Sequence, residues 1–461
     1  MPPTTKVTAA ADKNAAGMLA GLGMLFGLLY FVQGIVEPTD GLLSQPTKSL
    51  LRQWEHSAAS AAWFATILSL PWAIKPLYGL LTDFVPLAGS YRRSHLLLTT
   101  AVACAGLSAL YFLPLGSDSG TLLLTLLLLP AVAIAYSDVV TDALMIEVGQ
   151  PRGLTGRLQS IQWASIYTAT IFTGVTGGAL SQSGLQQLGF LIAGVSCAVS
   201  FFAVWLLVRE PDRASAVPCT SLLGSSGPCA GVKFRLGRAL SEMGQTFREP
   251  GVLTIGAFLF FWNFNPFSST VLYYYSTTNL HFSEQFVGTL TSWQAVGGVV
   301  GSILYGVFCR AMPVAWLIHG SIVTGILATL AYWGYRDPAS AVLVSVLAGL
   351  VYAIGSLVQL DLAARVCRPV TAGTTFALLM SLSNLSQSLS QGVGGSMFEA
   401  MARQWGHAWA FQLLVGAGAL ATAACWLLLP LLNRSIVAAG GGNTASGFSP
   451  AAAPGMPRQR S

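Results

Sequence analysis

Long uncharged segments constrain the fold of this chain more than any other feature. Eleven apolar stretches contain no Asp, Glu, Lys or Arg. A helix needs about 20 apolar residues to cross the hydrocarbon core of a bilayer, and its backbone polar groups must be satisfied within the segment. Ten stretches have the length of one such helix and the longest can hold two, so the sequence predicts an all-α polytopic membrane protein with twelve transmembrane helices. The stretches cover residues 14–36, 56–74, 94–117, 119–137, 158–208, 250–283, 285–309, 311–335, 338–360, 369–398 and 404–433.

The expected helices form two groups of six. A polar connection rich in Pro and Gly separates them at residues 209–249. Two six-helix halves joined by a long cytosolic loop are the plan of the major facilitator superfamily. The predicted organisation is a cytosolic N-terminus at 1–15, an N-terminal half at 16–208, the interdomain loop at 209–249, a C-terminal half at 250–432 and a disordered cytosolic tail at 433–461. The expected spans are 16–37, 57–81, 95–114, 121–148, 156–181, 186–208, 250–276, 284–308, 313–334, 339–363, 371–398 and 407–432.

Basic residues are divided unevenly between the two sides of the membrane. With a cytosolic N-terminus, eighteen Lys and Arg residues fall in cytosolic segments and four on the opposite side. Loops rich in Lys and Arg stay in the cytosol, so both termini are expected there. The net charge of +6 is then a consequence of topology, and no nucleic-acid partner is expected. The first helix has no cleavage site and a short leader, which favours a plasma (inner) membrane over a plastid envelope.

Cysteine and histidine residues give no catalytic or metal-binding pattern. The seven cysteines include no CxxC pair, and the five histidines occur singly without an acidic motif. Metal sites require characteristic Cys and His spacings. We therefore expect no metal, no cofactor and no enzymatic activity.

Three charged residues lie inside predicted helices. Asp138 and Asp142 are one helical turn apart and point the same way. Carboxylates in lipid are costly, so this face should meet a cavity or a cation, and the pair is a candidate proton carrier. Lys75 lies about 12 Å inside the membrane from Asp83, which predicts an ion pair with Asp142. The alternative is that Lys75 extends its stem to the cytosol.

Two further acidic positions lie near the cytosolic ends of helices. Glu147 lies on another face of helix 4, near the cytosol, and is expected to be solvated. Asp361 and Arg365 are spaced to pair at the end of helix 10.

The connection between helices 2 and 3 carries the densest motif of the chain. Gly79 and Asp83 end helix 2, and Arg92 and Arg93 begin helix 3. The Asp83 carboxylate can bind a helix N-terminus or an arginine in one access state and release it in the other, which makes this loop a candidate gate. The alternative is that the arginines only follow the topology rule.

Several motifs together resemble the folate/biopterin transporter family of the major facilitator superfamily. They are Tyr30-Phe-Val-Gln-Gly34, Lys75-Pro-Leu-Tyr-Gly79 with Asp83 and Tyr91-Arg-Arg93, Ser137-Asp-Val-Val-Thr-Asp142, Ser160-Ile-Gln-Trp163, Leu362-Ala-Ala-Arg-Val-Cys367 and Phe376-Ala-Leu-Leu-Met-Ser381. The resemblance implies a secondary transporter of folates or pteridines, mostly proton-linked. We expect the protein to be a monomer in the lipid bilayer. The chain departs from the family pattern at Ala372, where an acidic residue is usual, and at Ser90 or Ser94, where a third basic residue is common.

Pteridine recognition requires flat aromatic walls and an amide or carboxylate for the amino-pyrimidine edge. The candidate residues lie on helices 1, 7, 10 and 11. As alternatives, the aromatic residues belong to an interface belt and the small polar ones to helix packing. Glycine pairs in helices 5 and 8, Gly174-xxx-Gly178 and Gly297-xxx-Gly301, either pack within each half or meet across the halves. The binding candidates are Gln33, Trp262, Asn263, Asn265, Tyr274, Gln359, Asp361, Arg365, Asn384 and Gln387.

Two other functions compete with this interpretation. One keeps the fold and changes the cargo, for instance to a muropeptide or a drug. The other is a non-transporting assembly or pigment-delivery factor, for which loss of the Asp138 charge would leave function intact.

Overall fold

The computed structural model describes residues 4–152, 154–209, 248–308, 312–366 and 372–431, together with positions 237, 241 and 244. Within these ranges the regular structure is helical, and the prediction of an all-α fold with two six-helix halves is confirmed. Most of the predicted interdomain loop 209–249 and the predicted tail 433–461 lie outside the described residues.

The N-terminal half contains the six expected crossings and one additional short helix. Helix α1 starts earlier than expected because the Ala-rich segment before residue 16 is a strong helix former. The short helix α2 lies in the connection after α1, and the second crossing is divided between α3 and α4. The helices are α1 (Thr4–Val36), α2 (Ser44–Gln53), α3 (Ala58–Ala73), α4 (Lys75–Phe84), α5 (Arg93–Phe112), α6 (Gly120–Gly149), α7 (Thr155–Gln182) and α8 (Gln186–Leu207).

The break in the second crossing has a local cause. Pro71 lies inside α3 and Pro76 in the first turn of α4. Proline lacks the N–H that continues a helical ladder, so the chain leaves helical geometry at Ile74, where φ is −105° and ψ is 17°. Lys75 is therefore the first residue of α4.

The C-terminal half contains the other six crossings. The seventh crossing is interrupted around Pro266, after which it continues as α12 and the π-helical segment η3. The elements are α11 (Pro250–Asn263), α12 (Ser269–Tyr274), η3 (Tyr275–Asn279), α13 (Glu284–Phe308), α14 (Val314–Leu330), η5 (Ala331–Gly334), α15 (Pro338–Val366), α16 (Ala372–Trp405), α17 (His407–Ala424) and η6 (Cys425–Leu428).

The helices differ in how well they suit a lipid environment. Eight described segments are long and apolar enough to cross a membrane, and Ala20–Val36 and Pro250–Asn263 are apolar but shorter. Helices α7 and α16, with 28 and 34 residues, are long enough to cross and are not among the eight. Both lie against the other half, where α7 packs along α13 and α16 along α3, so part of their polar surface meets protein rather than lipid.

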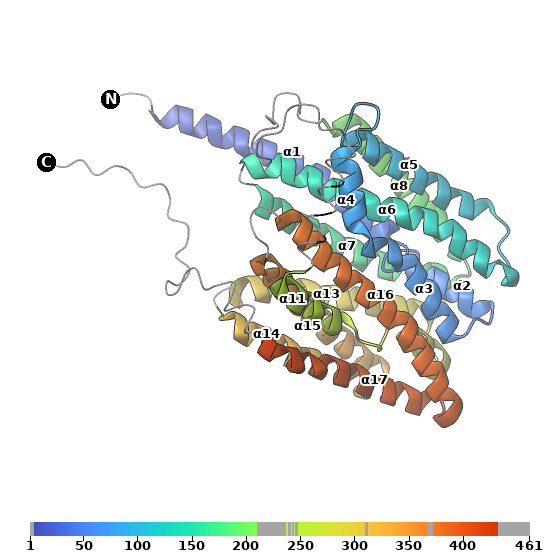
Figure 1. The fold of residues 1–461 in the computed structure, drawn as a ribbon. Coiled ribbons are helices and arrows are strands. Elements are labelled where there is room, and N and C mark those ends of the chain that lie inside the picture. Colours follow the sequence, from blue (N-terminus) through green and yellow to red (C-terminus); the bar gives the residue numbers. More distant parts are fainter. Residues whose placement is uncertain are drawn as a thin grey trace.

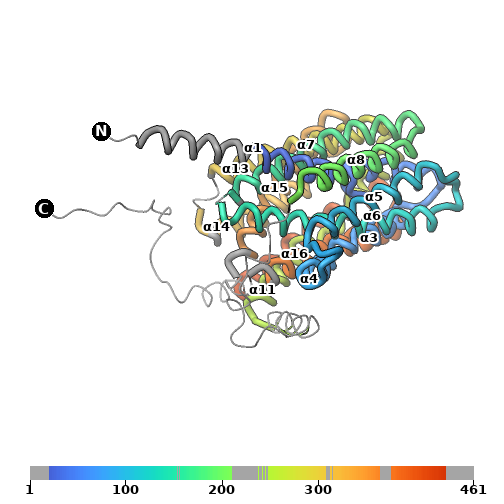
Figure 2. The backbone as a smooth tube through the Cα atoms, turned by 90° about the horizontal axis from the view of Figure 1, so that it is seen from above, coloured from blue at the N-terminus to red at the C-terminus, as the bar shows by residue number. Residues whose placement is uncertain are grey.

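Figure 1 shows the helices of the N-terminal half, blue to green, beside those of the C-terminal half, yellow to red. The view from above in Figure 2 shows both groups running along the same direction. The glycine pairs explain part of this contact. A Cβ on Gly174 would collide with Ser292 and with the backbone oxygen of Gly288, so this pair meets α13 across the halves. Gly297 and Gly301 instead face α15 within their own half.

Candidate functional site

The first group of site residues surrounds Asp138 on α6. Lys75 Nζ lies 2.6 Å from Asp138 Oδ2, and Gln33 Nε2 of α1 donates to Oδ1 at 2.6 Å. The Asp138 side chain is only 5% exposed and that of Lys75 21%. The expected ion pair between Lys75 and Asp142 is therefore wrong, since Asp138 takes the lysine. The expectation assumed a continuous second helix, and the break at Ile74 changes where Lys75 points.

Asp142 has a different set of partners. Tyr30 donates its hydroxyl to Asp142 Oδ1 at 2.5 Å, and Gln162 Nε2 donates to the same oxygen at 3.1 Å. Both donors are neutral, whereas Asp138 is paired with a cation. Sequence reasoning missed Tyr30 and Gln162 because it followed charge. A signal was available, because Tyr30 and Gln33 are three residues apart on α1 and share a face.

A small cavity lies behind this group within the N-terminal half. Its volume is about 30 Å³, and Gln33 lines it together with the hydroxyls of Ser137 and Thr141, which flank Asp138 in the chain. One water molecule needs about 10–15 Å³ of such space and two to four polar partners. The cavity beside Gln33, which hydrogen-bonds Asp138, is therefore large enough for water.

The Lys75 group also touches the other half of the protein. Lys75 Nζ lies 4.5 Å from the ring centroid of Trp72, which is a cation–π distance. Asn384 Nδ2 of α16 donates to the Trp72 backbone oxygen at 3.1 Å. The embedded cation thus lies beside the boundary where α3 meets α16.

Arg92 joins the ends of three helices in the N-terminal half. It is 4% exposed, and its Nη2 lies 2.6 Å from Asp83 Oδ1 and 2.8 Å from Glu147 Oε1. Burial lowers the pKa of Arg92, but the Asp83 and Glu147 carboxylates more than offset this, so the pKa ends above its usual value. Thr82 accepts a further hydrogen bond from Nη1. The expectation that Glu147 is solvated is wrong, because Arg92 reaches across from the start of α5.

The other predicted gate residues have simpler surroundings. Arg93 Nη2 donates to the backbone oxygen of Trp205 at 2.7 Å, which ties α5 to α8. A Cβ on Gly79 would meet only Val139 Cγ1, at 3.9 Å, so this glycine leaves room between α4 and α6.

Three of the predicted binding residues come together in the C-terminal half. Asn263 Nδ2 donates to Gln359 Oε1 at 2.7 Å and to Leu259 O at 2.8 Å, which fixes the orientation of both amides. The Trp262 ring lies against Gly355, one turn before Gln359 on α15. Trp262 Nε1 and Gln359 Nε2 are buried donors without a partner among the described residues. Buried donors normally have acceptors, so these two unpaired N–H groups are an unusual feature of the C-terminal half.

Two more predicted candidates connect separate elements, and the Tyr274 contact joins the two halves. Asn265 donates to Thr329 at 3.3 Å and accepts from the Phe267 N–H at 3.0 Å. The second bond gives an acceptor to a backbone N–H in the non-helical segment before α12. Tyr274 donates its hydroxyl to the backbone oxygen of His56 at 3.1 Å.

Three candidates remain on α15 and α16. Gln387 on α16 lies near Tyr352 of α15. Asp361 is half-buried near the end of α15. The side chain of Arg365 lies outside the described part of the chain, so the expected pair with Asp361 stays a prediction.

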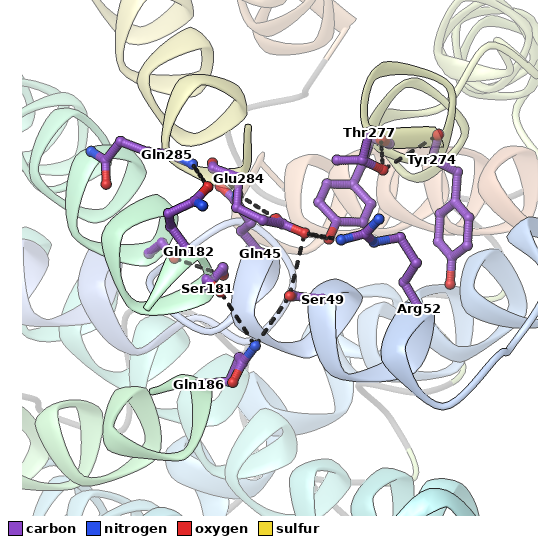
Figure 3. Close-up of polar contacts among 12 residues, drawn as sticks. Gln45, Ser49, Arg52, Ser181, Gln182, Gln186, Tyr274, Thr277, Glu284 and Gln285 are labelled. Atoms are coloured by element: carbon purple, nitrogen blue, oxygen red, sulfur yellow. Dashed lines mark hydrogen bonds and ion pairs between the residues drawn. The ribbon is translucent and has the colours of Figure 1, made fainter. Parts of the chain in front are cut away.

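A second polar cluster was missed by sequence reasoning. It surrounds Glu284, the first residue of α13, and Figure 3 shows its polar contacts. This end of the molecule is opposite the one that holds Arg92, which directly precedes α5. The available signal is that Glu284 is the single charge between the stretches 250–283 and 285–309. Among the described residues, no three His, Cys, Asp or Glu side chains gather as they would around a metal ion.

Comparison with known proteins agrees with these features. The model of the BT1 family matches residues 40–439. The chain is 31% identical over 382 residues to the folate-biopterin transporter of Synechocystis sp., covering 79% of this chain and 72% of that protein. It is 25% identical over 436 residues to probable folate-biopterin transporter 4 of Arabidopsis thaliana, covering 80% and 87%.

Solved structures of transporters share the fold. A mutant of the nucleoside transporter NupG superposes with a TM-score of 0.66 at 14% identity, covering 88% of this chain and 99% of that one. A D-xylose-proton symporter superposes with a TM-score of 0.63 at 13% identity, covering 88% and 96%.

Proposed function

The chain belongs to the BT1 family and is a membrane transporter, and from this premise we propose that it moves folate or a pteridine by alternating access, coupled to protons. The observation that carries the proposal is the buried Lys75–Asp138 pair with Asp142 one turn away. Charged side chains inside a membrane helix bundle cost free energy, and where they occur they commonly mark a path for substrate or ions.

We propose that the two carboxylates have different roles in proton coupling: Asp138 binds Lys75, and Asp142 binds the proton. Asp138 is neutralised by Lys75, while the described hydrogen-bond partners of Asp142, Tyr30 and Gln162, are uncharged. A buried carboxylate without a cation is stabilised by binding a proton. Proton binding at Asp142 and release toward the other side, with Lys75 moving between the two carboxylates, would link the proton to the change of access.

We propose that the cargo binds between this group and the C-terminal half. Trp262 supplies an aromatic face, and the N–H groups of Trp262 and Gln359 supply donors for a ring carbonyl or ring nitrogen of a pteridine. Asn384 connects the two sides through Trp72, beside Lys75. A cargo bound here would be sensed by both halves and would leave chemically unchanged, without a cofactor.

We also propose that the Arg92 end of the molecule faces the cytosol, with both termini on that side. The excess of Lys and Arg in the loops at that end supports this orientation. In the proposed cycle the Arg92–Asp83–Glu147 cluster is a cytosolic latch that is rebuilt when access changes.

Uptake into vesicles tests the proposal. Purified protein in proteoliposomes is given labelled folate or biopterin, with and without an imposed pH gradient. Accumulation that depends on the gradient and is lost in Asp142→Asn is the expected result. Transport of neither compound would refute the cargo assignment, and uptake that ignores the gradient would refute proton coupling.

A further inference from the structure

Glu284 is held by donors from both halves of the protein. Its Oε1 lies 2.7 Å from Arg52 Nη2 and accepts the Tyr273 hydroxyl at 2.7 Å, while Oε2 accepts from Gln45 Nε2 at 3.0 Å. Arg52 and Gln45 come from α2 of the N-terminal half, and Tyr273 from α12 of the C-terminal half. Figure 3 shows the Glu284 carboxylate beside Gln45, Ser49 and Arg52, and the residue is only 8% exposed.

The surrounding contacts extend this connection. Ser49 Oγ approaches Glu284 Oε1 at 3.4 Å, and Gln186 Nε2 of α8 donates to Ser49 at 3.3 Å. Gln45 Nε2 also donates to the backbone oxygen of Glu284 at 2.6 Å. The carboxylate is thus tied through α2 to the far side of the N-terminal half.

Close backbone packing makes these contacts possible. A Cβ on Gly178 of α7 would lie 3.0 Å from the Glu284 backbone oxygen, and a Cβ on Gly288 would lie 2.7 Å from Gly178 Cα. Helices α7 and α13 can therefore approach at this end closely enough for α2 to reach Glu284.

We propose that Glu284 is the centre of a gate on the side opposite Arg92, which joins the two halves while this side is closed and separates when it opens. The proposal rests on the alternating access of the proposed function. Arg52, Gln45 and Ser49 would all leave the carboxylate on opening, whereas Tyr273, from its own half, would stay. By contrast, the ion pairs of Asp138 and Arg92 lie within the N-terminal half, and Arg403–Glu399 lies within α16.

The strongest contact of the gate is the ion pair between Arg52 and Glu284. Hydrogen bonds between a guanidinium and a carboxylate are about twice as strong as neutral ones, and removal of one partner leaves a buried charge. Neutralising either Arg52 or Glu284 should therefore shift the ratio of closed to open molecules by about tenfold or more, which is the effect of losing one charge-assisted hydrogen bond.

Distance measurements between spin labels test the gate without transport. Ser183 and Arg336 are exposed, lie in loops of different halves at the gated end and are outside the cluster, so both can be replaced by labelled cysteine in a background lacking the native cysteines. Arg52→Glu and Glu284→Arg should each lengthen the distance distribution. The double exchange R52E/E284R should restore much of the short distance, and Arg403→Gln, which removes an exposed ion pair at the same end, should change nothing.

Two results would overturn the gate. In one, the single variants keep the short distance of the unmodified protein. In the other, the double exchange is as open as the single variants, so the charges do not act on each other. Arg52→Gln serves as a milder variant where a charge reversal prevents folding. Failure of the cargo assignment would appear separately, as absent folate or biopterin uptake by the unmodified protein.

Discussion

Removing Lys75 should destabilise the protein more than removing both members of its ion pair. In Lys75→Met the Asp138 carboxylate, 5% exposed, would keep only the hydrogen bond from Gln33. Breaking a buried pair by deleting one partner costs about 3–5 kcal/mol. Because the Lys75 side chain is 21% exposed, water reaches the pair, and we expect about 3 kcal/mol, the lower end of that range.

The other variants complete a double-mutant cycle. Asp138→Asn should cost less, since Lys75 can extend its stem toward water when its partner is neutral. K75M/D138N leaves no uncompensated charge and should be more stable than Lys75→Met alone, although it carries one more substitution. The difference between the double variant and the sum of the singles measures the pair directly.

Thermal unfolding in detergent, followed by tryptophan fluorescence, is a suitable assay. For a chain of 461 residues a loss of 3 kcal/mol corresponds to about 3 °C in Tm from the average entropy of unfolding per residue. Arg403→Gln, which breaks a pair with an Arg403 side chain 76% exposed, is the control and should shift Tm by less than about 1 °C. Additive effects of the two single substitutions would refute the reasoning, because they would mean that Lys75 and Asp138 do not interact energetically.

Three further predictions concern other groups. Glu147→Gln should slow transport and lower stability by about 1–2 kcal/mol, because Arg92 loses one of two carboxylates; unchanged uptake rates and Tm would contradict the latch. Trp262→Phe keeps the aromatic face and removes only the N–H, so it should raise the KM for a pteridine about tenfold with little change in Tm, and an unchanged KM would exclude Trp262 as a donor. Burial, followed by repulsion from a neighbouring carboxylate, raises the pKa of Glu37 from 4.5 to about 7. The folded chain then retains a proton that the unfolded chain loses, so Tm should fall as pH rises from about 4.5 to 7, and Glu37→Gln should flatten this slope.

The crossings could be predicted from sequence because a bilayer imposes a simple rule on charge and length. The rule fails where a crossing is broken or where a helix does not cross. A count of apolar length does not register the breaks at Ile74 and Pro266, which lie at or beside prolines. Helix α2 has ten residues and two basic side chains, so a search for apolar length passes over it.

The residues of the site were easier to predict than their pairing. Asp138, Asp142 and Lys75 could be singled out because each interrupts an apolar region. Which carboxylate binds the lysine depends on the rotation of α4 after the break, and this rotation is a property of tertiary packing. The neutral donors Tyr30 and Gln162 gave no charge signal.

Glu284 and Glu147 show a related limit. Both lie at helix ends, where a charge is ordinarily explained by solvent. Their partners, Arg52 and Arg92, are distant in the sequence or on another helix. Only an arrangement of helices in space can turn such terminal charges into partly buried ion pairs.

Proton movement driven by the cargo is the most direct sign of coupling through Asp142. Proteoliposomes containing a pH-sensitive dye receive folate or biopterin on one side with no imposed gradient. We expect a pH change that follows cargo uptake and is lost in Asp142→Asn, while Arg403→Gln behaves like the unmodified protein. Uptake of cargo without any accompanying pH change, or an undiminished pH change in Asp142→Asn, would contradict it.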